Sequence, residues 1–145
     1  MEAFVVAPAG FLLAVLWFDL MFDTQVRSAT PPAGAVTSIS AYYRRVTTDA
    51  RPMNFAVSGA MVATVVAIVV EILTTNPVWL GWSSLVFALA PMGLAARRTV
   101  PNAVRLGQAV DPPADQLRRA RSVLRDHCWC IVSIAVLVGM QLVHA

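Results

Sequence analysis

Two aspartates inside an apolar run are the residues of this sequence best suited to do chemistry. Asp19 and Asp23 lie in "WFDLMFD", residues 17–23, at the end of an apolar stretch that begins at residue 3. Their spacing of four places both carboxylates on one face of a helix. A charged carboxylate within a membrane helix costs roughly 2.5–3.5 kcal/mol unless it is paired. Asp19 is about one turn deeper and therefore needs a partner, whereas Asp23 is expected only to mark where the helix leaves the bilayer.

A histidine near the last apolar run could complete a site with these carboxylates. His127 follows Asp126, and imidazole can act as acid, base or metal ligand near neutral pH. We interpret His127, Asp19 and Asp126 as candidate catalytic residues. Asp19, Asp23 and His127 could also form a two-carboxylate, one-histidine metal site, although no H-x-x-x-H spacing supports it. The alternative is that Asp19 forms a structural ion pair with an arginine at the rim of the bundle.

The composition indicates membrane helices. Hydrophobic residues make up 58% of the 145 residues and charged residues only 13%, against about 25% charged in a soluble domain. A helix needs roughly 20 apolar residues to cross a bilayer core. Four segments qualify: about residues 3–22, 53–73, 78–96 and 127–143. We predict an all-α, four-helix transmembrane bundle that forms one domain over residues 1–145, with the first run retained as a span and not removed as a signal peptide.

The distribution of basic residues predicts the orientation. All eleven are arginines, and they lie within or bordering the connections 24–52 and 97–126. The positive-inside rule makes these loops cytoplasmic and both termini external, in a plasma or inner membrane. The same end then gathers Asp23, Asn54, Arg97 and Arg98, which we interpret as candidate ligand-binding residues.

The two arginine-bearing connections contain helical patterns of their own. Apolar residues recur every three or four positions from Val36 to Ala50, which predicts an amphipathic interfacial helix between spans one and two. It could lie on the inner leaflet, with its arginines near anionic headgroups, or pack against the end of the bundle. Further on, Asp111 can cap a helix that begins near Pro112. That helix would run to Val143, roughly 47 Å at 1.5 Å per residue.

Glu71 is a further candidate ligand-binding residue, near the opposite end of the bundle. It continues a stripe of small residues on span two, so it should point into the bundle, although a hydrated carboxylate at the interface is the simpler alternative. Span one has its own small-residue face, formed by Ala3, Ala7, Gly10 and Ala14. That face lies nearly opposite the aspartates, so the two patterns predict different packing faces.

No motif in the sequence indicates a cofactor. There is no Walker loop, no G-x-S-x-G and no c-type haem motif. His127 and His144 would lie at opposite ends of one helix, which excludes bis-histidine haem within the chain. The cysteines of "CWC", residues 128–130, point to different helix faces and make a poor metal site. Expected partners are the bilayer, anionic headgroups at the arginine-rich loops, and a second copy or another membrane protein, but not nucleic acid.

Several of these features resemble the anthrone oxygenase-like family of small four-helix membrane proteins. They are a first span running into the helical "ISAYYRRVTTDARPMNFAV", a third span ending in "RRTVPNAVRLG", and an arginine-rich helix entering span four through "LRRARSVLRDHCWC". The family pattern is an Asn-His pair followed two residues later by Arg. His127 matches the histidine, while Asp126 and Trp129 replace the asparagine and the arginine. A second, purely architectural likeness is to trimeric membrane enzymes of eicosanoid and glutathione metabolism.

The first resemblance implies a cofactor-independent oxygenase that converts polyketide anthrones to anthraquinones. His127 would then be the base that deprotonates an acidic C–H, so that the carbanion meets O₂, and Asp126 or Asp19 would orient its imidazole. Three functions remain open from the sequence: an enzyme or binding protein for a lipophilic aromatic or lipid substrate at the cytoplasmic rim, a non-catalytic membrane subunit, and an oligomeric transporter with Glu71 and Asp19 at the two ends of a path.

Overall fold

The computed structural model describes residues 2–75 and 77–144, apart from the side chain of Arg51. These residues form helices and connections, with no strand in the described part of the chain. In chain order the helices are α1 (Glu2–Asp23), α2 (Ala35–Arg44), α3 (Arg51–Thr74), α4 (Val78–Leu94), α5 (Val100–Gln108) and α6 (Pro113–Val143). The predicted all-α, four-helix bundle is confirmed.

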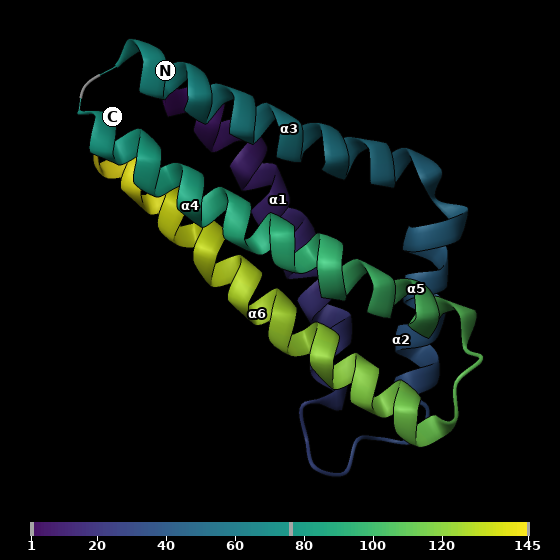
Figure 1. Cartoon of the computed structure of the whole chain (residues 1–145). Helices are drawn as coiled ribbons and strands as arrows, with labels where there is room; N and C mark the ends of the chain where they lie inside the picture. Colours follow the sequence, from purple (N-terminus) through teal and green to yellow (C-terminus); the bar gives the residue numbers. More distant parts are fainter. Residues whose placement is uncertain (1, 76, 145) are drawn as a thin grey trace.

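Four helical segments are long and apolar enough to cross a membrane, and they characterise the chain as an integral membrane protein. They begin at Glu2, Pro52, Val78 and Pro113. Figure 1 shows α1, α3, α4 and α6 side by side, with α2 and α5 gathered at one end and both chain termini at the other. The bundle therefore has two unlike ends, one bare and one covered by short helices.

The third span is longer than predicted. After α4 the chain continues through a π-helical turn (Ala95–Thr99) directly into α5. Pro101 does not break this path because it lies in the first turn of α5, where a missing N–H is tolerated. The segment 97–126, predicted as a loop, is therefore mostly helical, and only residues 109–112 within it are not.

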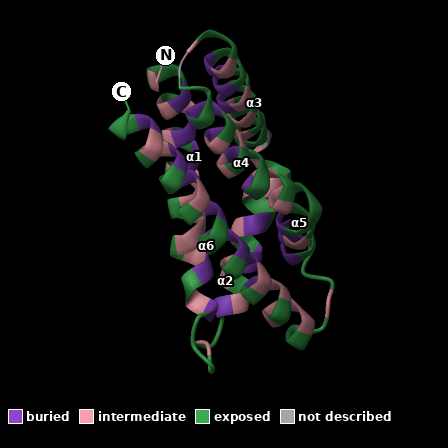
Figure 2. Cartoon of the chain, turned by 60° about the vertical axis from the view of Figure 1, so that its left-hand side comes forward, coloured by how far each residue is buried: buried purple, intermediate pink, exposed green. Residues whose placement is uncertain are grey.

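The bundle-facing side of α1 is the aspartate side. Its buried residues are Val5, Ala9, Leu12 and Asp23, spaced at three or four residues or their sums, as on one helix face. Ala3, Ala7 and Ala14, from the small-residue face, are exposed instead. Of the two predicted packing faces of α1, the structure therefore has the aspartate face inside the bundle and the small-residue face outside. Figure 2 shows this burial confined to the sides where helices meet.

The proline in α4 is accommodated by α6. Pro91 has no N–H, so the carbonyl of Phe87, four residues earlier, lacks its helical donor. The Ser133 hydroxyl on α6 donates to that carbonyl at 2.9 Å. The contact supplies the missing hydrogen bond from a neighbouring helix, which is how membrane bundles tolerate proline.

The helix predicted between spans one and two is α2, and it packs against protein. Ile39 and Tyr43 of its apolar stripe are buried in one cluster with Leu106 of α5 and Val123 of α6. Of the two predicted placements, the structure has the one in which the stripe covers the end of the bundle. Gly107 sits at the crossing of α5 and α2, where a Cβ would lie 2.7 Å from the backbone nitrogen of Arg44.

Asp111 does not cap α6 as predicted. The residue before α6 is Pro112, which makes no side-chain cap. Asp111 instead accepts hydrogen bonds from Arg105 (2.7 Å) and Arg119 (2.8 Å), and so ties the end of α5 to α6. These guanidinium groups, Arg105 first, lower the pKa of the Asp111 carboxyl below its usual range.

Candidate functional site

The helix pairing brings His127 and the two aspartates together. The chain direction makes α1 and α6 antiparallel neighbours, so the end of α1 meets the middle of α6. Asp19 and Asp23 lie on the face of α1 that packs on α6, and His127 is buried on the facing side. Tyr42 and Tyr43 of α2 join them from the end of the bundle. We call these five residues, Asp19, Asp23, Tyr42, Tyr43 and His127, the histidine cluster.

Asp23 holds one edge of the imidazole. Its Oδ2 lies 2.7 Å from His127 Nδ1, and its Oδ1 accepts a hydrogen bond of 2.7 Å from the Tyr43 hydroxyl. Asp23 has no exposed surface. The prediction that it merely marks the exit from the bilayer was therefore wrong, because both of its oxygens are bound inside the protein.

Asp19 faces the other edge of the imidazole without bonding to it. Its Oδ2 is 3.8 Å from His127 Nε2, beyond hydrogen-bonding distance. Its Oδ1 accepts a hydrogen bond of 2.6 Å from the Tyr42 hydroxyl. Its side chain is 14% exposed, against 9% for His127. No arginine described by the structure pairs with Asp19, so the structural ion pair considered from the sequence is replaced by a tyrosine hydrogen bond.

The tyrosines are the members of the cluster that sequence reasoning missed. Burial and the facing carboxylates raise the pKa of both hydroxyls, with burial the larger cause. Each hydroxyl therefore stays protonated and acts as a donor to its aspartate. Tyr42 also stacks on Phe22, with ring centroids 4.0 Å apart. The available signal was the adjacent pair of tyrosines on a helix that returns to the end of span one, where buried carboxylates need donors.

Asp126 belongs to a different contact, although it precedes His127 in the chain. It is fully buried and accepts two hydrogen bonds from Arg98, one of them at 2.8 Å from Nε, and a third from Thr99 at 3.3 Å. Successive helix residues point about 100° apart, so Asp126 faces the α4–α5 segment while His127 faces α1. Asp126 therefore does not orient the imidazole; Asp23 does.

Other candidate residues lie outside the cluster. Asn54 is exposed and donates to the carbonyl of Thr47 at 3.3 Å, which ties the start of α3 to the preceding π-helical turn. Arg97 is exposed and forms no ion pair within the described residues. Arg98 forms an ion pair with Asp126 and keeps 45% of its side chain exposed. Of the five predicted ligand-binding residues, only Asp23 is in the histidine cluster.

Glu71 lies at the other end, in a second buried polar group. Gln141 Nε2 on α6 donates to Glu71 Oε2 at 2.8 Å and to Ser84 Oγ of α4 at 3.0 Å. Glu71 is buried, so it points into the bundle as its helix face predicted, and the simpler alternative of a hydrated interfacial carboxylate is wrong. Among the described residues, the carbonyl oxygen of Gln141 has no hydrogen-bond partner. We call Glu71, Ser84 and Gln141 the glutamate cluster.

The histidine cluster is arranged for proton transfer more than for metal binding. The two carboxylates face opposite ring nitrogens of His127, so they do not converge on one point with a free imidazole lone pair. Within residues 2–75 and 77–144, no group of three or more His, Cys, Asp and Glu could hold a metal ion. A carboxylate can only accept a hydrogen bond, so Nδ1 is the protonated nitrogen and Nε2 carries the lone pair of the neutral ring.

The geometry thus defines a class: a four-helix membrane protein with an aspartate-oriented histidine buried between two of its helices. No family model, no curated protein and no solved structure matched this chain in the comparisons with known proteins. The function must therefore be argued from the site.

Proposed function

We propose that this protein is a membrane-embedded enzyme in which His127 removes a proton from a lipophilic, weakly acidic substrate. The observation that supports this most directly is the 2.7 Å contact of Asp23 with Nδ1, which places the proton of the neutral ring on that nitrogen. Nε2 then carries the lone pair, and it makes no hydrogen bond with any described residue. Orientation by a carboxylate is how enzymes prepare a histidine to act as a general base. The substrate C–H would approach Nε2 from the side of Asp19, the more exposed of the two side chains.

Both carboxylates favour the transfer. When Nε2 takes the proton, the ring becomes a cation between Asp23 at Nδ1 and Asp19 at Nε2, and their charges stabilise it. The two tyrosine hydroxyls hold the carboxylates in place, so little reorganisation accompanies the change of charge. Proton transfer by a positioned base contributes typically 10²–10⁴-fold to a rate.

For the substrate we propose a planar aromatic compound with an activated CH₂ group, as the family resemblance implies. His127 takes one proton of the CH₂ group and leaves the electron pair on carbon. The carbanion transfers electrons to O₂ and forms a C–O bond, and the peroxide regains the proton from the imidazolium. Loss of water, with the second C–H proton, converts the hydroperoxide to a ketone, so that O₂ is the only oxidant required.

Deuterium exchange tests the proton step by itself. Anthrone would be incubated in D₂O without oxygen, with the protein in lipid nanodiscs, and loss of the CH₂ signal would be followed by NMR. Exchange should be faster with the wild type than with His127→Ala by about 10²-fold or more. Cys128→Ala is the matched control, because Cys128 is the exposed neighbour of His127. Equal exchange by wild type and His127→Ala would contradict a base at this position.

Oxygen uptake then tests the oxygenase step. With air admitted, the wild type should consume O₂ and release anthraquinone, and His127→Ala should not. Exchange without oxygen uptake would keep His127 as a base and reject the oxygenase reaction.

Transport is less well supported than catalysis. The core between the two polar clusters is apolar, formed by Val5, Ala9, Ala67, Ile68, Ala88, Ile134 and Leu137. A polar path through one chain would have to cross this layer.

We also propose that the end bearing α2 and α5 faces the cytoplasm. The distribution of all eleven arginines near this end supports it. A cysteine introduced at Ala114, in a variant lacking Cys128 and Cys130, should react with a membrane-impermeant maleimide in inverted vesicles but not in intact cells. The reverse pattern would invert the orientation.

A further inference from the structure

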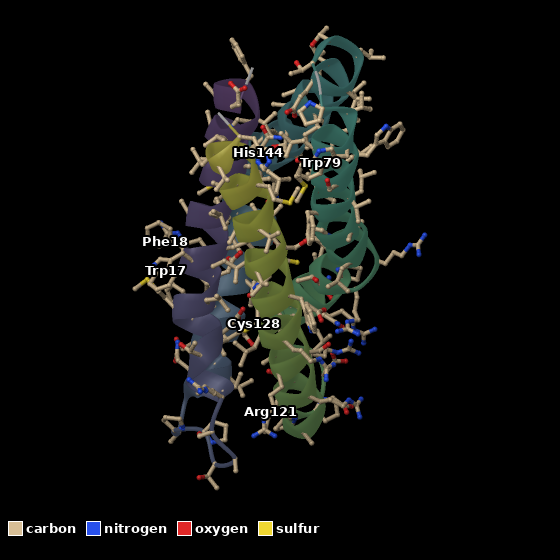
Figure 3. All side chains as sticks on the ribbon, turned by 90° about the vertical axis from the view of Figure 1, so that its left-hand side faces the viewer. Trp17, Phe18, Trp79, Arg121, Cys128 and His144 are labelled. Carbon is tan, nitrogen blue, oxygen red and sulfur yellow. The ribbon has the colours of Figure 1, made fainter. Side chains whose placement is uncertain are left out.

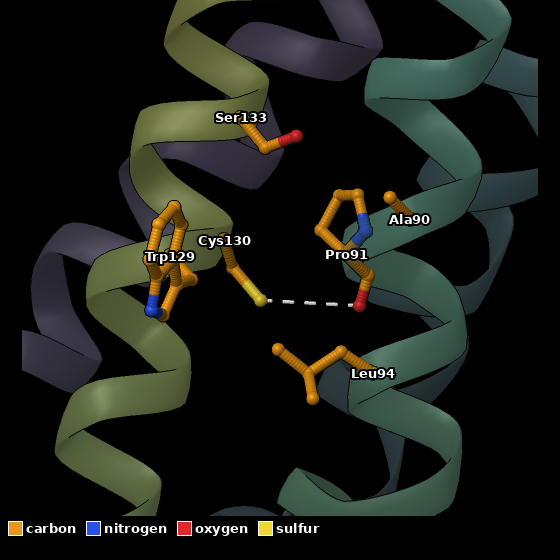
Figure 4. A pocket seen from close by; sticks show the side chains of 6 residues that line it. All are labelled: Ala90, Pro91, Leu94, Trp129, Cys130 and Ser133. Atoms are coloured by element: carbon orange, nitrogen blue, oxygen red, sulfur yellow. Dashed lines mark hydrogen bonds between the residues drawn. The ribbon is translucent and has the colours of Figure 1, made fainter.

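A crevice on the membrane-facing side of the bundle lies between α4 and α6. Its volume is about 200 Å³, and it is lined by Ala90, Pro91, Leu94, Trp129, Cys130 and Ser133. Figure 4 shows Trp129 and Ser133 on one wall and Pro91 and Leu94 on the other. The hydroxyl of Ser133 and the thiol of Cys130 are turned toward backbone carbonyls of α4. The crevice therefore offers an apolar surface to the lipid.

Basic residues stand directly beyond the arginine-rich end of this crevice. Arg98 is four residues after Leu94, in the π-helical turn that continues α4. Arg125 is four residues before Trp129 on α6, one turn further along the same helix face. Arg98 reaches across to Asp126 of α6, which places it at the junction of the two helices. Arg125 is exposed, and it forms no ion pair with any residue that the structure describes.

Trp129 lies between the apolar crevice and the arginines. It is 68% exposed, and its indole nitrogen points away from Ser133, toward the end of the helices that carries the arginines (Figure 4). Indole N–H groups at this level bond to polar headgroups while the ring contacts acyl chains. The crevice therefore has positively charged arginines at one end and an apolar surface along its length.

We propose that this crevice binds an anionic phospholipid, with one acyl chain between α4 and α6 and the phosphate at Arg125 and Arg98. The phosphate supplies the negative charge that Arg125 lacks inside the protein, and basic pockets between membrane helices are known to select anionic headgroups. Asp126 neutralises only one of the two arginines, so the junction keeps a net positive charge. The site lies on the face of α6 away from His127 and does not depend on catalysis.

Quenching of tryptophan fluorescence by brominated lipids tests this site. A variant with Trp17→Phe, Trp79→Phe and Trp82→Phe leaves Trp129 as the only tryptophan. In vesicles with equal fractions of brominated lipid, brominated phosphatidylglycerol should quench Trp129 more than brominated phosphatidylcholine. The expected enrichment is about fivefold per arginine, and Arg125→Gln should reduce it by about that factor. Ala90→Phe, which fills the crevice without changing charge, should lower quenching by both lipids.

A matched reporter at the other end provides the control. The variant that keeps only Trp79, where Figure 3 shows the tryptophan beside His144 and far from Arg121, should show no preference for the anionic lipid. Equal quenching of Trp129 by both brominated lipids would overturn the proposal. So would loss of the preference when soluble glycerol phosphate is added, because the site would then bind a free phosphate and not a lipid.

Discussion

The two buried polar clusters of this bundle differ in what they leave unbonded. In the histidine cluster both oxygens of Asp23 and Nδ1 of His127 are bonded, whereas Nε2, a base, and Oδ2 of Asp19 face each other at 3.8 Å without a hydrogen bond from any described residue. In the glutamate cluster the fully buried atom without a hydrogen bond from any described residue is the carbonyl oxygen of Gln141, an acceptor that does not act as a base. A buried polar group in a membrane helix is a candidate functional site by default, but only the first cluster sets a histidine between carboxylates, the combination used in general-base chemistry.

The clusters also differ in how they are covered. The histidine cluster lies where α2 closes the end of the bundle and supplies two hydroxyl donors. The glutamate cluster lies at the bare end, where three spans meet without a covering helix. We therefore expect substitutions in the first cluster to change activity, and those in the second to change only stability.

Asp23→Asn should have the largest effect. The asparagine amide can donate to Nδ1, which would move the ring proton to Nε2 and remove the base while keeping the shape of the site. We expect deuterium exchange on anthrone to fall by about 10²–10⁴-fold. Glu71→Gln is the matched amide substitution in the other cluster and should leave exchange unchanged. A similar loss in both variants would remove the distinction between the clusters.

Tyr43→Phe should cost more stability than Ser84→Ala. The first substitution leaves Oδ1 of the fully buried Asp23 without its donor, at about 1–3 kcal/mol. The second removes one of two acceptors of Gln141, which keeps its bond to Glu71, so about 0.5–1.5 kcal/mol is expected. Reversible unfolding in mixed detergent micelles measures both values. A larger loss of stability for Ser84→Ala would mean that the hydrogen bonds of the glutamate cluster contribute more to the unfolding free energy than those of the histidine cluster.

Glu71→Gln should cost little and can stabilise the bundle. A glutamine at this position can accept from Gln141 Nε2 and donate to Gln141 Oε1, a buried acceptor that no described residue bonds to. We expect a change in unfolding free energy within about 1 kcal/mol. Glu71→Ala, which provides neither atom, is the control and should destabilise. Strong destabilisation by both would indicate that the charge of Glu71 is needed.

The smallest effect is expected outside both clusters, at Asp111. Its pKa is lowered in the folded protein, so its bonds to Arg105 and Arg119 add stability above the ordinary pKa of about 3.9. That contribution is lost as the pH falls through the lowered pKa of the folded state. Asp111→Asn should therefore be less stable than wild type at pH 6, and the difference should shrink toward pH 3 in acid titrations of unfolding. A difference that stays constant with pH would assign another role to this carboxylate.

The sequence alone determined the class of the molecule. Four apolar runs of sufficient length and a deficit of charge require a helical membrane bundle, because backbone groups in lipid must be bonded within each helix. It also placed Asp19, Asp23 and His127 at one end of the bundle, since alternating spans return the chain to the same side. Those inferences depend only on local periodicity and on the order of the segments.

Only the tertiary structure decided which side chains bond. His127 and Asp126 are adjacent in the sequence, yet the 100° step of the helix sends one to α1 and the other to Arg98. The sequence predicted two different packing faces for α1. The face with the aspartates is the one that packs inside the bundle, because the tyrosines of α2 and the histidine of α6 supply the donors that a buried carboxylate requires. The small residues carry no polar side chain that needs a donor, so their face can contact lipid. Contacts with residues distant in the chain therefore fix the rotation of each helix about its axis. A local sequence pattern cannot predict these contacts.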